Sequence, residues 1–384
     1  MKKICFITGT RADYGILMPI MKKIKAFPDA TLQIIATNMH LALDYGLTYK
    51  EIEKDGFLIN CKIESLIPGN TSESTVKSMA KVQSGLADAF NELKPDIVVI
   101  LGDRYEALAS ASAAVTFGIP VAHLHGGEIT EGAIDDMFRN AITMLSSIHF
   151  ASTAEYAANI TRMTGSTNNV YLVGAPGADI NDLKLNSDQL TKEFLEKTGL
   201  RKEDKFILFT MHSVTKLPDL GISEIKETIK ALKESIDEGY KILVTLPNSD
   251  PGNVSVTELL IKWHKKYPSS VICVKSLGSG LFHYAMSTAS LMIGNSSAAL
   301  IEAPSHYLPS INIGYRQKGR STGPSVINVK ADSNEIKSAI IRGLTLEFKK
   351  KLLDLSFQEI NPYYKPKASE FIAEKLLEYK KEEI

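Results

Sequence analysis

Titratable side chains follow short apolar runs in the first half of the chain, where they could move protons. The apolar run 97–101 is followed, after one glycine, by Asp103, and the run 121–124 is followed by His125 and Glu128. Carboxylates and imidazoles are the usual general acids and bases of enzymes. These positions therefore predict a site for acid–base chemistry.

A second charged group lies farther along, at Asp135, Asp136 and Arg139. Adjacent aspartates are also favoured at a helix N-terminus, so one of the two has a structural explanation. Arg104, beside Asp103, could form a surface ion pair with that carboxylate. Its place directly after an apolar run favours a ligand-binding edge instead.

The second half of the chain carries a turn suited to a phosphate. Segment 294–302 reads Gly-Asn-Ser-Ser-Ala-Ala-Leu-Ile-Glu and follows an apolar run. Backbone N–H groups, the hydroxyls of Ser296 and Ser297 and a helix start would suit a diphosphate. Glu302 lies five residues past Ser297, one to two turns into the predicted helix, where its carboxylate could accept hydrogen bonds from a ribose. Arg316 follows the next apolar run.

Polar residues follow three further apolar runs. His212 comes just after the run 206–210, and Asn248 comes just after the run 241–246. The first run of the chain ends in Gly-Thr-Arg-Ala-Asp-Tyr-Gly at 9–15. This turn is not the Gly-x-Gly-x-x-Gly fingerprint, which disfavours a dinucleotide cofactor.

Parallel sheets would bring these positions together, since ligands of open α/β sheets bind at the carboxyl ends of strands. Apolar runs alternate with amphipathic segments, which is typical of buried parallel strands joined by helices. We predict an α/β fold of two Rossmann-like doubly wound domains, at 1–178 and 179–365, with a C-terminal helix at 366–384. The predicted strands are 4–8, 32–37, 97–101, 121–124, 148–151, 170–173, 206–210, 241–246, 271–274, 291–293, 311–313 and 326–329, with helices at 15–26, 74–93 and 105–117.

Bulk composition fits a cytoplasmic enzyme. The 384 residues are 44% hydrophobic and 23% charged, and 44 basic side chains balance 44 acidic ones. This balance argues against binding to nucleic acid or to an anionic membrane, and no apolar run approaches the length of a membrane span. The N-terminal run predicts a strand rather than a signal peptide. Cys5, Cys61 and Cys273 are far apart, so we expect free thiols and no metal site.

Five motifs, taken together and in order, resemble the hydrolysing UDP-N-acetylglucosamine 2-epimerases of sialic- and legionaminic-acid biosynthesis. They are Gly-Thr-Arg-Ala-Asp-Tyr-Gly at 9–15, Gly-Asp-Arg-Tyr-Glu at 102–106, His-Gly-Gly-Glu at 125–128, Gly-Asn-Ser-Ser at 294–297 and Arg-Gln-Lys-Gly-Arg at 316–320. The resemblance implies two domains of the glycosyltransferase-B type facing a cleft, with the C-terminal helix crossing back onto the first domain. It also implies a nucleotide-sugar substrate, no cofactor, and a homodimer or tetramer.

The same resemblance implies roles for individual residues. It implies nucleotide-diphosphate contacts for Arg11, His212, Asn248, Ser296, Ser297, Glu302 and Arg316. It implies other substrate contacts for Asp13, His40 and Arg104, and sugar-site or catalytic roles for Asp103, Asp135 and Arg139. Many relatives have a glutamate where this chain has His125. Either His125 or Glu128, three residues later, therefore takes over an acid–base task.

The implied reaction begins when a carboxylate base removes the C2 proton of UDP-N-acetylglucosamine as UDP leaves C1. Water then adds to the resulting 2-acetamidoglucal, and a proton returns to C2 on the opposite face, which gives N-acetylmannosamine. UDP-N,N′-diacetylbacillosamine and GDP-N-acetylglucosamine are alternative substrates for the same chemistry.

Three other classes of protein share part of this pattern. The non-hydrolysing 2-epimerases have Pro-Glu after Gly-Thr-Arg, whereas this chain has Ala12 and Asp13. A retaining glycosyltransferase would not need so many carboxylates in its first domain. A nucleotide-sugar sensor without activity would be expected to lose carboxylates such as Asp103.

Overall fold

The computed structural model describes residues 1–69, 71–181, 183, 185, 187–248, 250 and 252–380. Its internal contacts divide the chain into two units. The first unit contains Met1–Glu128, Asp135–Asp179 and the chain from Lys365 onward. The second unit contains Ile180–Tyr364 and one short segment from the first half, Ile129–Ile134. That segment falls inside the range 1–178 that the sequence pattern assigns to the first domain.

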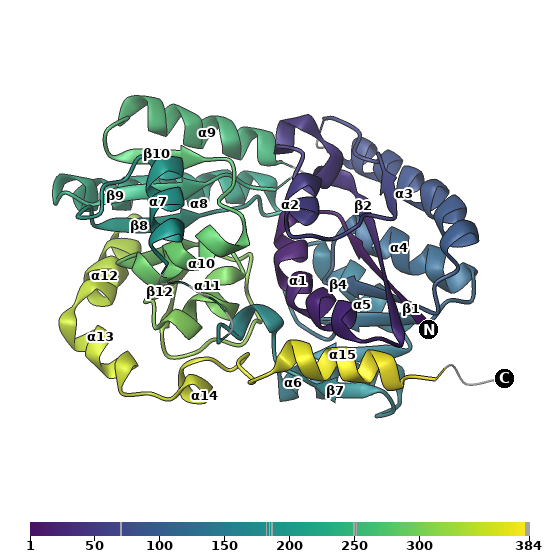
Figure 1. The fold of residues 1–384 in the computed structure, drawn as a ribbon. Helices are drawn as coiled ribbons and strands as arrows, with labels where there is room; N and C mark the ends of the chain where they lie inside the picture. The colour runs from purple at the N-terminus through teal and green to yellow at the C-terminus, as the bar shows by residue number, and fades with distance from the viewer. Residues whose placement is uncertain are drawn as a thin grey trace. The chain divides into compact units, whose positions relative to one another are not determined.

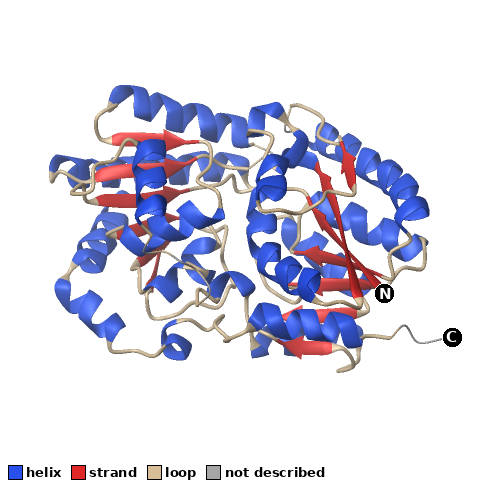
Figure 2. Cartoon of the chain, in the orientation of Figure 1, coloured by secondary structure: helices blue, strands red, loops and turns tan. Residues whose placement is uncertain are grey.

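The described part of the first unit contains a seven-stranded parallel sheet in the order β3-β2-β1-β4-β5-β6-β7 (Figures 1 and 2). The strands are β1 (Lys2–Thr8), β2 (Ala30–Thr37), β3 (Cys61–Ile63), β4 (Ile97–Leu101), β5 (Val121–Leu124), β6 (Ile148–Ala151) and β7 (Val170–Leu172). Strand β3 is not among the predicted strands, because its three residues, Cys-Lys-Ile, form no apolar run.

Helices cover both faces of this sheet and pack apolar side chains against it. They are α1 (Arg11–Ala26), α2 (Tyr49–Lys54), α3 (Ser72–Leu93), α4 (Tyr105–Thr116), α5 (Asp135–Leu145), α6 (Ala154–Thr164) and α15 (Ala368–Glu378), with short 3₁₀ turns η1 (Asn38–Leu41), η2 (Leu43–Tyr45) and η3 (Pro176–Ala178). In α1 the buried residues Leu17, Ile20, Met21 and Ile24 recur every three or four positions, the spacing of one helix face.

The C-terminal helix α15, yellow in Figure 1, packs on α1 of the first unit. Its residues Ile372 and Leu376 are fully buried in the same core as α1. The backbone N–H of Lys367 donates to the carboxylate of Asp179 at 2.7 Å, just before the helix begins. Residues 381–384 of the predicted helix 366–384 lie outside the described residues.

The second unit repeats the pattern with a six-stranded parallel sheet, ordered β10-β9-β8-β11-β12-β13 over the described residues. The strands are β8 (Phe206–Thr210), β9 (Lys241–Thr245), β10 (Val271–Val274), β11 (Leu291–Gly294), β12 (Ser310–Ile313) and β13 (Val326–Val329). The helices are α7 (Asp188–Thr198), α8 (Pro218–Asp237), α9 (Asn253–Lys266), α10 (Ser279–Thr288), α11 (Ala298–Ile301), α12 (Ser333–Leu344), α13 (Leu346–Leu353) and α14 (Phe357–Ile360), with the 3₁₀ turn η4 (Ala303–His306).

Both sheets are doubly wound, as predicted, and both reverse their strand order at one point. The reversal falls between β1 and β4 in the first unit and between β8 and β11 in the second. Ligands of such sheets bind at this reversal, outside the carboxyl ends of the strands.

Cys5, Cys61 and Cys273 are free thiols, as expected, and burial raises the pKa of Cys273 to about 11. None of the described helices combines the length and the apolar character that crossing a membrane requires.

Candidate active site

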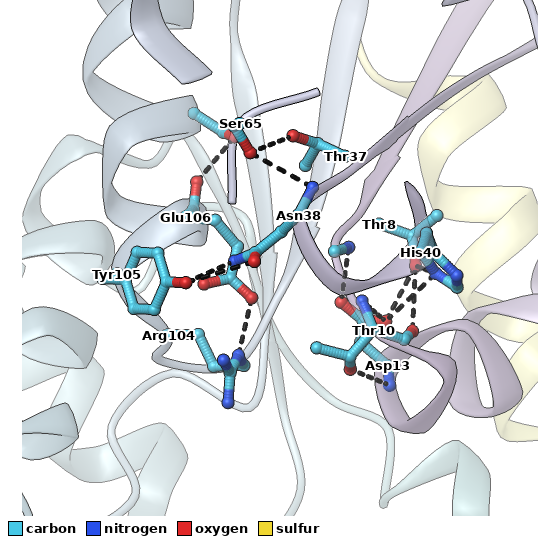
Figure 3. A network of polar contacts seen from close by, with 12 residues as sticks. Thr8, Thr10, Asp13, Thr37, Asn38, His40, Ser65, Arg104, Tyr105 and Glu106 are labelled. Atoms are coloured by element: carbon cyan, nitrogen blue, oxygen red, sulfur yellow. Dashed lines mark hydrogen bonds and ion pairs between the residues drawn. The ribbon is translucent and has the colours of Figure 1, made fainter. Parts of the chain in front are cut away.

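The turn after β1 is built around the carboxylate of Asp13 (Figure 3). Its Oδ1 accepts from the Thr8 hydroxyl at 2.7 Å, the Thr10 N–H at 3.0 Å and the Tyr14 N–H at 2.6 Å. Its Oδ2 accepts from the N–H of Gly9 at 3.0 Å. Thr10 and Asp13 form a reciprocal capping box at the start of α1. Asp13, a predicted substrate contact, is therefore engaged in holding the turn.

Two other predicted residues adjoin this turn. His40 is fully buried, and its ring nitrogens lie 2.9 Å from the Thr8 hydroxyl and 2.8 Å from the Thr48 hydroxyl. Burial lowers the pKa of His40, so the ring is neutral near pH 7. Arg11 is the first residue of α1, and burial lowers its pKa to about 10, with Glu51 opposing the shift. This arginine keeps its charge at neutral pH.

The neighbouring strand β4 ends in a second group of polar contacts (Figure 3). The Nε of Arg104 donates to Glu106 Oε1 at 2.6 Å. Glu106 is buried, its Oε2 has no hydrogen-bond partner among the described residues, and burial raises its pKa although Arg104 opposes this. A Cβ on Gly9 would lie 2.8 Å from this carboxylate, so the close approach requires glycine. Glu106 lies within a predicted motif but is not among the predicted site residues.

Arg139 is the centre of the charged group at the start of α5. Its guanidinium is fully buried, donates to Asp103 and lies 3.2 Å from Asp136 Oδ1. It also donates to the backbone carbonyl of Glu128 at 2.9 Å. The structure thus brings together Asp103 and Arg139, which lie 36 positions apart in the sequence. It also pairs Asp136, rather than its neighbour Asp135, with this arginine.

His125 and Glu128 form a buried pair after β5. The Nδ1 of His125 lies 2.6 Å from Glu128 Oε1, and the hydroxyl of Ser152 donates to the same oxygen at 2.7 Å. The opposite ring nitrogen, Nε2, has no hydrogen-bond partner in the part of the chain that the structure describes. His125 has a left-handed backbone with φ of 64°, an uncommon conformation for a residue with a side chain. Such strain is found most often at functional sites.

The polar turn of the second unit is built around Asn295. Its side chain bridges to the backbone of His212, accepting from its N–H at 2.7 Å and donating to its carbonyl at 2.9 Å. The turn begins at Gly294 with φ of 143°, and a Cβ there would lie 1.9 Å from the carbonyl oxygen of Thr210. Glycine is therefore needed for β11 and β8 to end side by side.

Arg316 joins this turn from the loop after β12. Its Nη1 donates to the carbonyl of Asn295 at 3.1 Å, and the amide of Gln317 donates to the same oxygen at 2.9 Å. The Nε of Arg316 is buried and finds no hydrogen-bond partner among described residues. The predicted residues His212, Ser296 and Arg316 are thus gathered around Asn295.

The helix after this turn is shorter than the sequence pattern predicts. It is α11, which ends at Ile301, so Glu302 caps it and does not lie one to two turns inside it. Pro304 follows, and because proline has no N–H to donate, the chain continues as the 3₁₀ turn η4. A four-residue helix contributes little dipole, so an anion at Ser296 and Ser297 would depend on local N–H and hydroxyl groups.

The remaining predicted residues of the second unit lie near strand ends. Glu302 is half-buried, and burial raises its pKa to about 7. Asn248 follows β9, and its carbonyl accepts from the amide of Asn253 at 2.5 Å. The contacts seen within the described ranges do not join Glu302 or Asn248 to the cluster around Asn295.

A buried glutamate that no sequence motif marks supports the loop after β12, which carries Tyr315 and Arg316. We call it the Arg316 loop. Glu224, on α8, accepts from the N–H of Tyr315 at 3.0 Å. A Cβ on Gly314, whose φ is 75°, would lie 2.1 Å from Glu224 Oε1. Burial raises the pKa of Glu224 to about 6. The residue is a polar position on an amphipathic helix, so only the folded chain shows its partner.

The fold is that of an α/β protein with two doubly wound units, each carrying a polar cluster at its strand ends. The family model of UDP-N-acetylglucosamine 2-epimerase matches residues 22–377. The chain is 38% identical over 91% of its length to a GDP/UDP-N,N′-diacetylbacillosamine 2-epimerase (hydrolyzing) of Campylobacter jejuni, covering 89% of that protein. It is 32% identical over 90% of its length to a UDP-N-acetylglucosamine 2-epimerase of Neisseria meningitidis, covering 88% of that protein. The chain belongs to the UDP-N-acetylglucosamine 2-epimerase family.

Solved structures agree with this fold. A UDP-N-acetylglucosamine 2-epimerase of Neisseria meningitidis, crystallised with UDP-N-acetylglucosamine, superimposes with a TM-score of 0.80 at 21% identity, covering 98% of this chain and 100% of that one. A plant glycosyltransferase of Glycyrrhiza uralensis superimposes less closely, with a TM-score of 0.58 at 12% identity over 98% of this chain and 95% of that one.

Proposed function

We propose that this protein is a hydrolysing 2-epimerase, which releases the nucleotide diphosphate from a nucleotide-linked 2-acetamido sugar and inverts C2. The observation that carries the proposal is the pair of His125 and Glu128, in which a buried carboxylate orients an imidazole whose Nε2 has no partner among the described residues. An imidazole held in this way is a general base at one nitrogen.

In the first step of the proposed reaction, a base removes the C2 proton of the sugar. The electron pair of that C–H bond forms a C1–C2 double bond, and the C1–O bond breaks with its pair leaving on the diphosphate. In the second step water adds its oxygen to C1 and loses one proton to a base, and a proton is delivered to C2 from the opposite face. Two proton-transfer groups on different faces are needed. We assign them to the His125–Glu128 pair and to Asp103 or Asp135, with Arg139 positioning Asp103.

We assign the nucleotide diphosphate to the second unit. The guanidinium of Arg316 supplies positive charge beside the turn that carries Ser296 and Ser297, and charge-assisted hydrogen bonds to phosphate are the strong ones. His212 and Asn248 lie at neighbouring strand ends of the same sheet. Arg11, which keeps its charge, is assigned to the same diphosphate.

Two substrates are distinguished by the group on sugar C4, which is a hydroxyl in UDP-N-acetylglucosamine and an acetamido group in UDP-N,N′-diacetylbacillosamine. The motifs alone favour the first. The second is favoured by identity, since two relatives named for it are 38% and 35% identical to this chain, against 32% for one named for the first. GDP-N-acetylglucosamine remains the third candidate, and a homo-oligomer remains a prediction.

The test is to incubate the purified protein with each of the three nucleotide sugars, without NAD, and to follow free nucleotide and free sugar by NMR. We expect one substrate to yield equal amounts of nucleoside diphosphate and free 2-epimerised sugar. Accumulation of a nucleotide-linked epimer, with no free sugar, would contradict the hydrolysing assignment.

A further inference from the structure

The chain passes from the first unit to the second and back within a few residues. It leaves the first unit after Glu128 and returns to it at Asp135. The residues between them, Ile129–Ile134, belong to the second unit by their contacts. We call Ile129–Ile134 the crossing segment. In the proposed function, Glu128 belongs to one proton-transfer pair and Asp135 is a candidate for the other proton-transfer group.

The crossing segment is hydrogen-bonded to two loops of the second unit. The N–H of Glu131 donates to the carbonyl of Lys318 at 3.0 Å, and the carbonyl of Glu131 accepts from Lys216 Nζ at 2.8 Å. The N–H of Ile134 donates to the hydroxyl of Thr215 at 3.0 Å. An exposed ion pair of 2.7 Å also joins Glu131 to Lys318, although such pairs contribute little to stability. The segment is therefore fixed mainly through its backbone.

Within the crossing segment, Gly132 lies tightly against the backbone of the Arg316 loop. A Cβ on this residue would lie 2.5 Å from the carbonyl oxygen of Tyr315 and 2.8 Å from the Cα of Arg316. Both atoms belong to the backbone, so they cannot turn aside as a flexible side chain would. Gly132 does not have a left-handed backbone. Glycine is required here by the contact with the Arg316 loop and not by its own conformation.

The Arg316 loop is itself held on its other side. Glu224 accepts the N–H of Tyr315, and Gly319 packs against Ile129, where a Cβ on the glycine would lie 2.6 Å from Ile129 Cγ2. The contacts at Gly132 and Gly319 leave no gap between this loop and the crossing segment. Displacement of the loop would therefore displace the crossing segment.

We propose that Gly132 is a positioning residue, which couples occupancy of the Arg316 loop by a diphosphate to the placement of Glu128 and Asp135. The inference depends on the proposed function, in which Arg316 binds the diphosphate, Glu128 forms a proton-transfer pair with His125, and Asp135 is a candidate for the second proton-transfer group. Only the six residues of the crossing segment separate the two carboxylates in the sequence. A shift of about 1 Å at a reacting group can lower a rate about 10²-fold, so a tight backbone contact is sufficient to matter.

The experiment compares Gly132→Ala with Gly280→Ala. Gly280 is exposed and has an ordinary backbone, and its Cβ would meet only Leu190 Cδ1 at 3.9 Å, an ordinary contact. We expect Gly132→Ala to lower kcat about 30- to 100-fold, with KM and the Kd for UDP changed less than about fivefold. We expect Gly280→Ala to match the wild type. A purely structural role for Gly132 would lower Tm while leaving kcat of the folded fraction unchanged, and that result would overturn the proposal.

A second measurement does not depend on turnover or on a folded variant. Hydrogen exchange is followed in the intact wild-type protein, at the amides of residues 129–134, with and without UDP. We expect UDP to slow exchange at the amides of Glu131 and Ile134 at least threefold. Exchange unchanged by saturating UDP would contradict the coupling. Failure of the wild type to process any nucleotide sugar would contradict the proposed function instead, so the two failures are distinguishable.

Discussion

Oε1 of Glu128 lies 2.6 Å from Nδ1 of His125 and also accepts a hydrogen bond from the hydroxyl of Ser152. With its Oε1 occupied in this way, Glu128 is placed to orient the imidazole. The sequence leaves His125 and Glu128 as alternatives for one acid–base task, whereas we propose that the two residues perform this task together.

A double-variant comparison tests whether His125 and Glu128 act as one unit. We expect His125→Asn and Glu128→Gln each to lower turnover by about 10²–10⁴, with UDP affinity changed less than threefold. The double variant should be no slower than the slower single variant, because the pair is lost only once. The exposed Glu92→Gln on α3 is the control. If the fold-losses of the two single variants multiply in the double variant, the two residues act independently.

Asp135 and Asp136 are adjacent, yet we expect different consequences from their amide variants. Asp136 lies 3.2 Å from the buried Arg139, so Asp136→Asn should lower the free energy of unfolding by about 1–2 kcal/mol, with turnover retained within tenfold. Asp135→Asn should lower turnover by about 10²–10⁴. Urea unfolding and steady-state kinetics measure the two effects. If instead Asp135→Asn lowers the free energy of unfolding and Asp136→Asn lowers turnover, Asp135 is the structural member of the pair.

Arg316→Ala should weaken UDP binding by about 1.5–3 kcal/mol, which is roughly a 10- to 150-fold rise in Kd. The reason is the loss of charge-assisted hydrogen bonds from a guanidinium already held by the carbonyl of Asn295. Titration calorimetry with UDP gives the value. Arg342→Ala, at an exposed position on α12, serves as the matched control. Equal affinities of the two variants would remove Arg316 from the nucleotide site.

Stability should fall as pH rises through the range set by Glu302. Burial raises its pKa from 4.5 to about 7, so the folded state binds more protons than the unfolded state between these values. The contribution of Glu302 to the free energy of unfolding is therefore fully present below about pH 4.5 and is lost as pH rises through about 7. Glu224, whose pKa is raised to about 6, acts in the same direction. Glu302→Gln should remove up to about 3 kcal/mol of the difference in unfolding free energy between pH 5 and pH 8. Urea unfolding at both pH values checks this against the exposed Glu258→Gln, for which no change in slope is expected.

Much of the fold follows from the sequence because buried parallel strands are continuous apolar runs. The predicted bounds of 97–101, 121–124 and 206–210 coincide with β4, β5 and β8. Strand β3 escapes prediction because only one of its three residues, Ile63, is buried. The pattern overestimates the length of α11 because a single proline changes the helix to a 3₁₀ turn.

The candidate site is less readable from sequence because its polar residues also serve the backbone. Asp13 is predicted as a substrate contact, and its oxygens also cap α1. Glu224 gives no sequence signal, because its role arises only when α8 packs against the loop at Tyr315. Gly132 is likewise one glycine among 25 until the backbone beside it is known. Motifs locate strand ends, whereas partners separated by tens of residues are set by packing.

Removal and replacement of the C2 proton of the sugar is the step on which the proposed function depends, and isotope exchange at C2 reports on it. The reaction is run in deuterated water with whichever nucleotide sugar the protein consumes, and the free sugar is analysed by NMR. We predict one deuterium at C2 in every product molecule, together with inverted configuration at that carbon. A released sugar that keeps its original hydrogen at C2 would show simple hydrolysis of the C1–O bond and would contradict the proposed elimination.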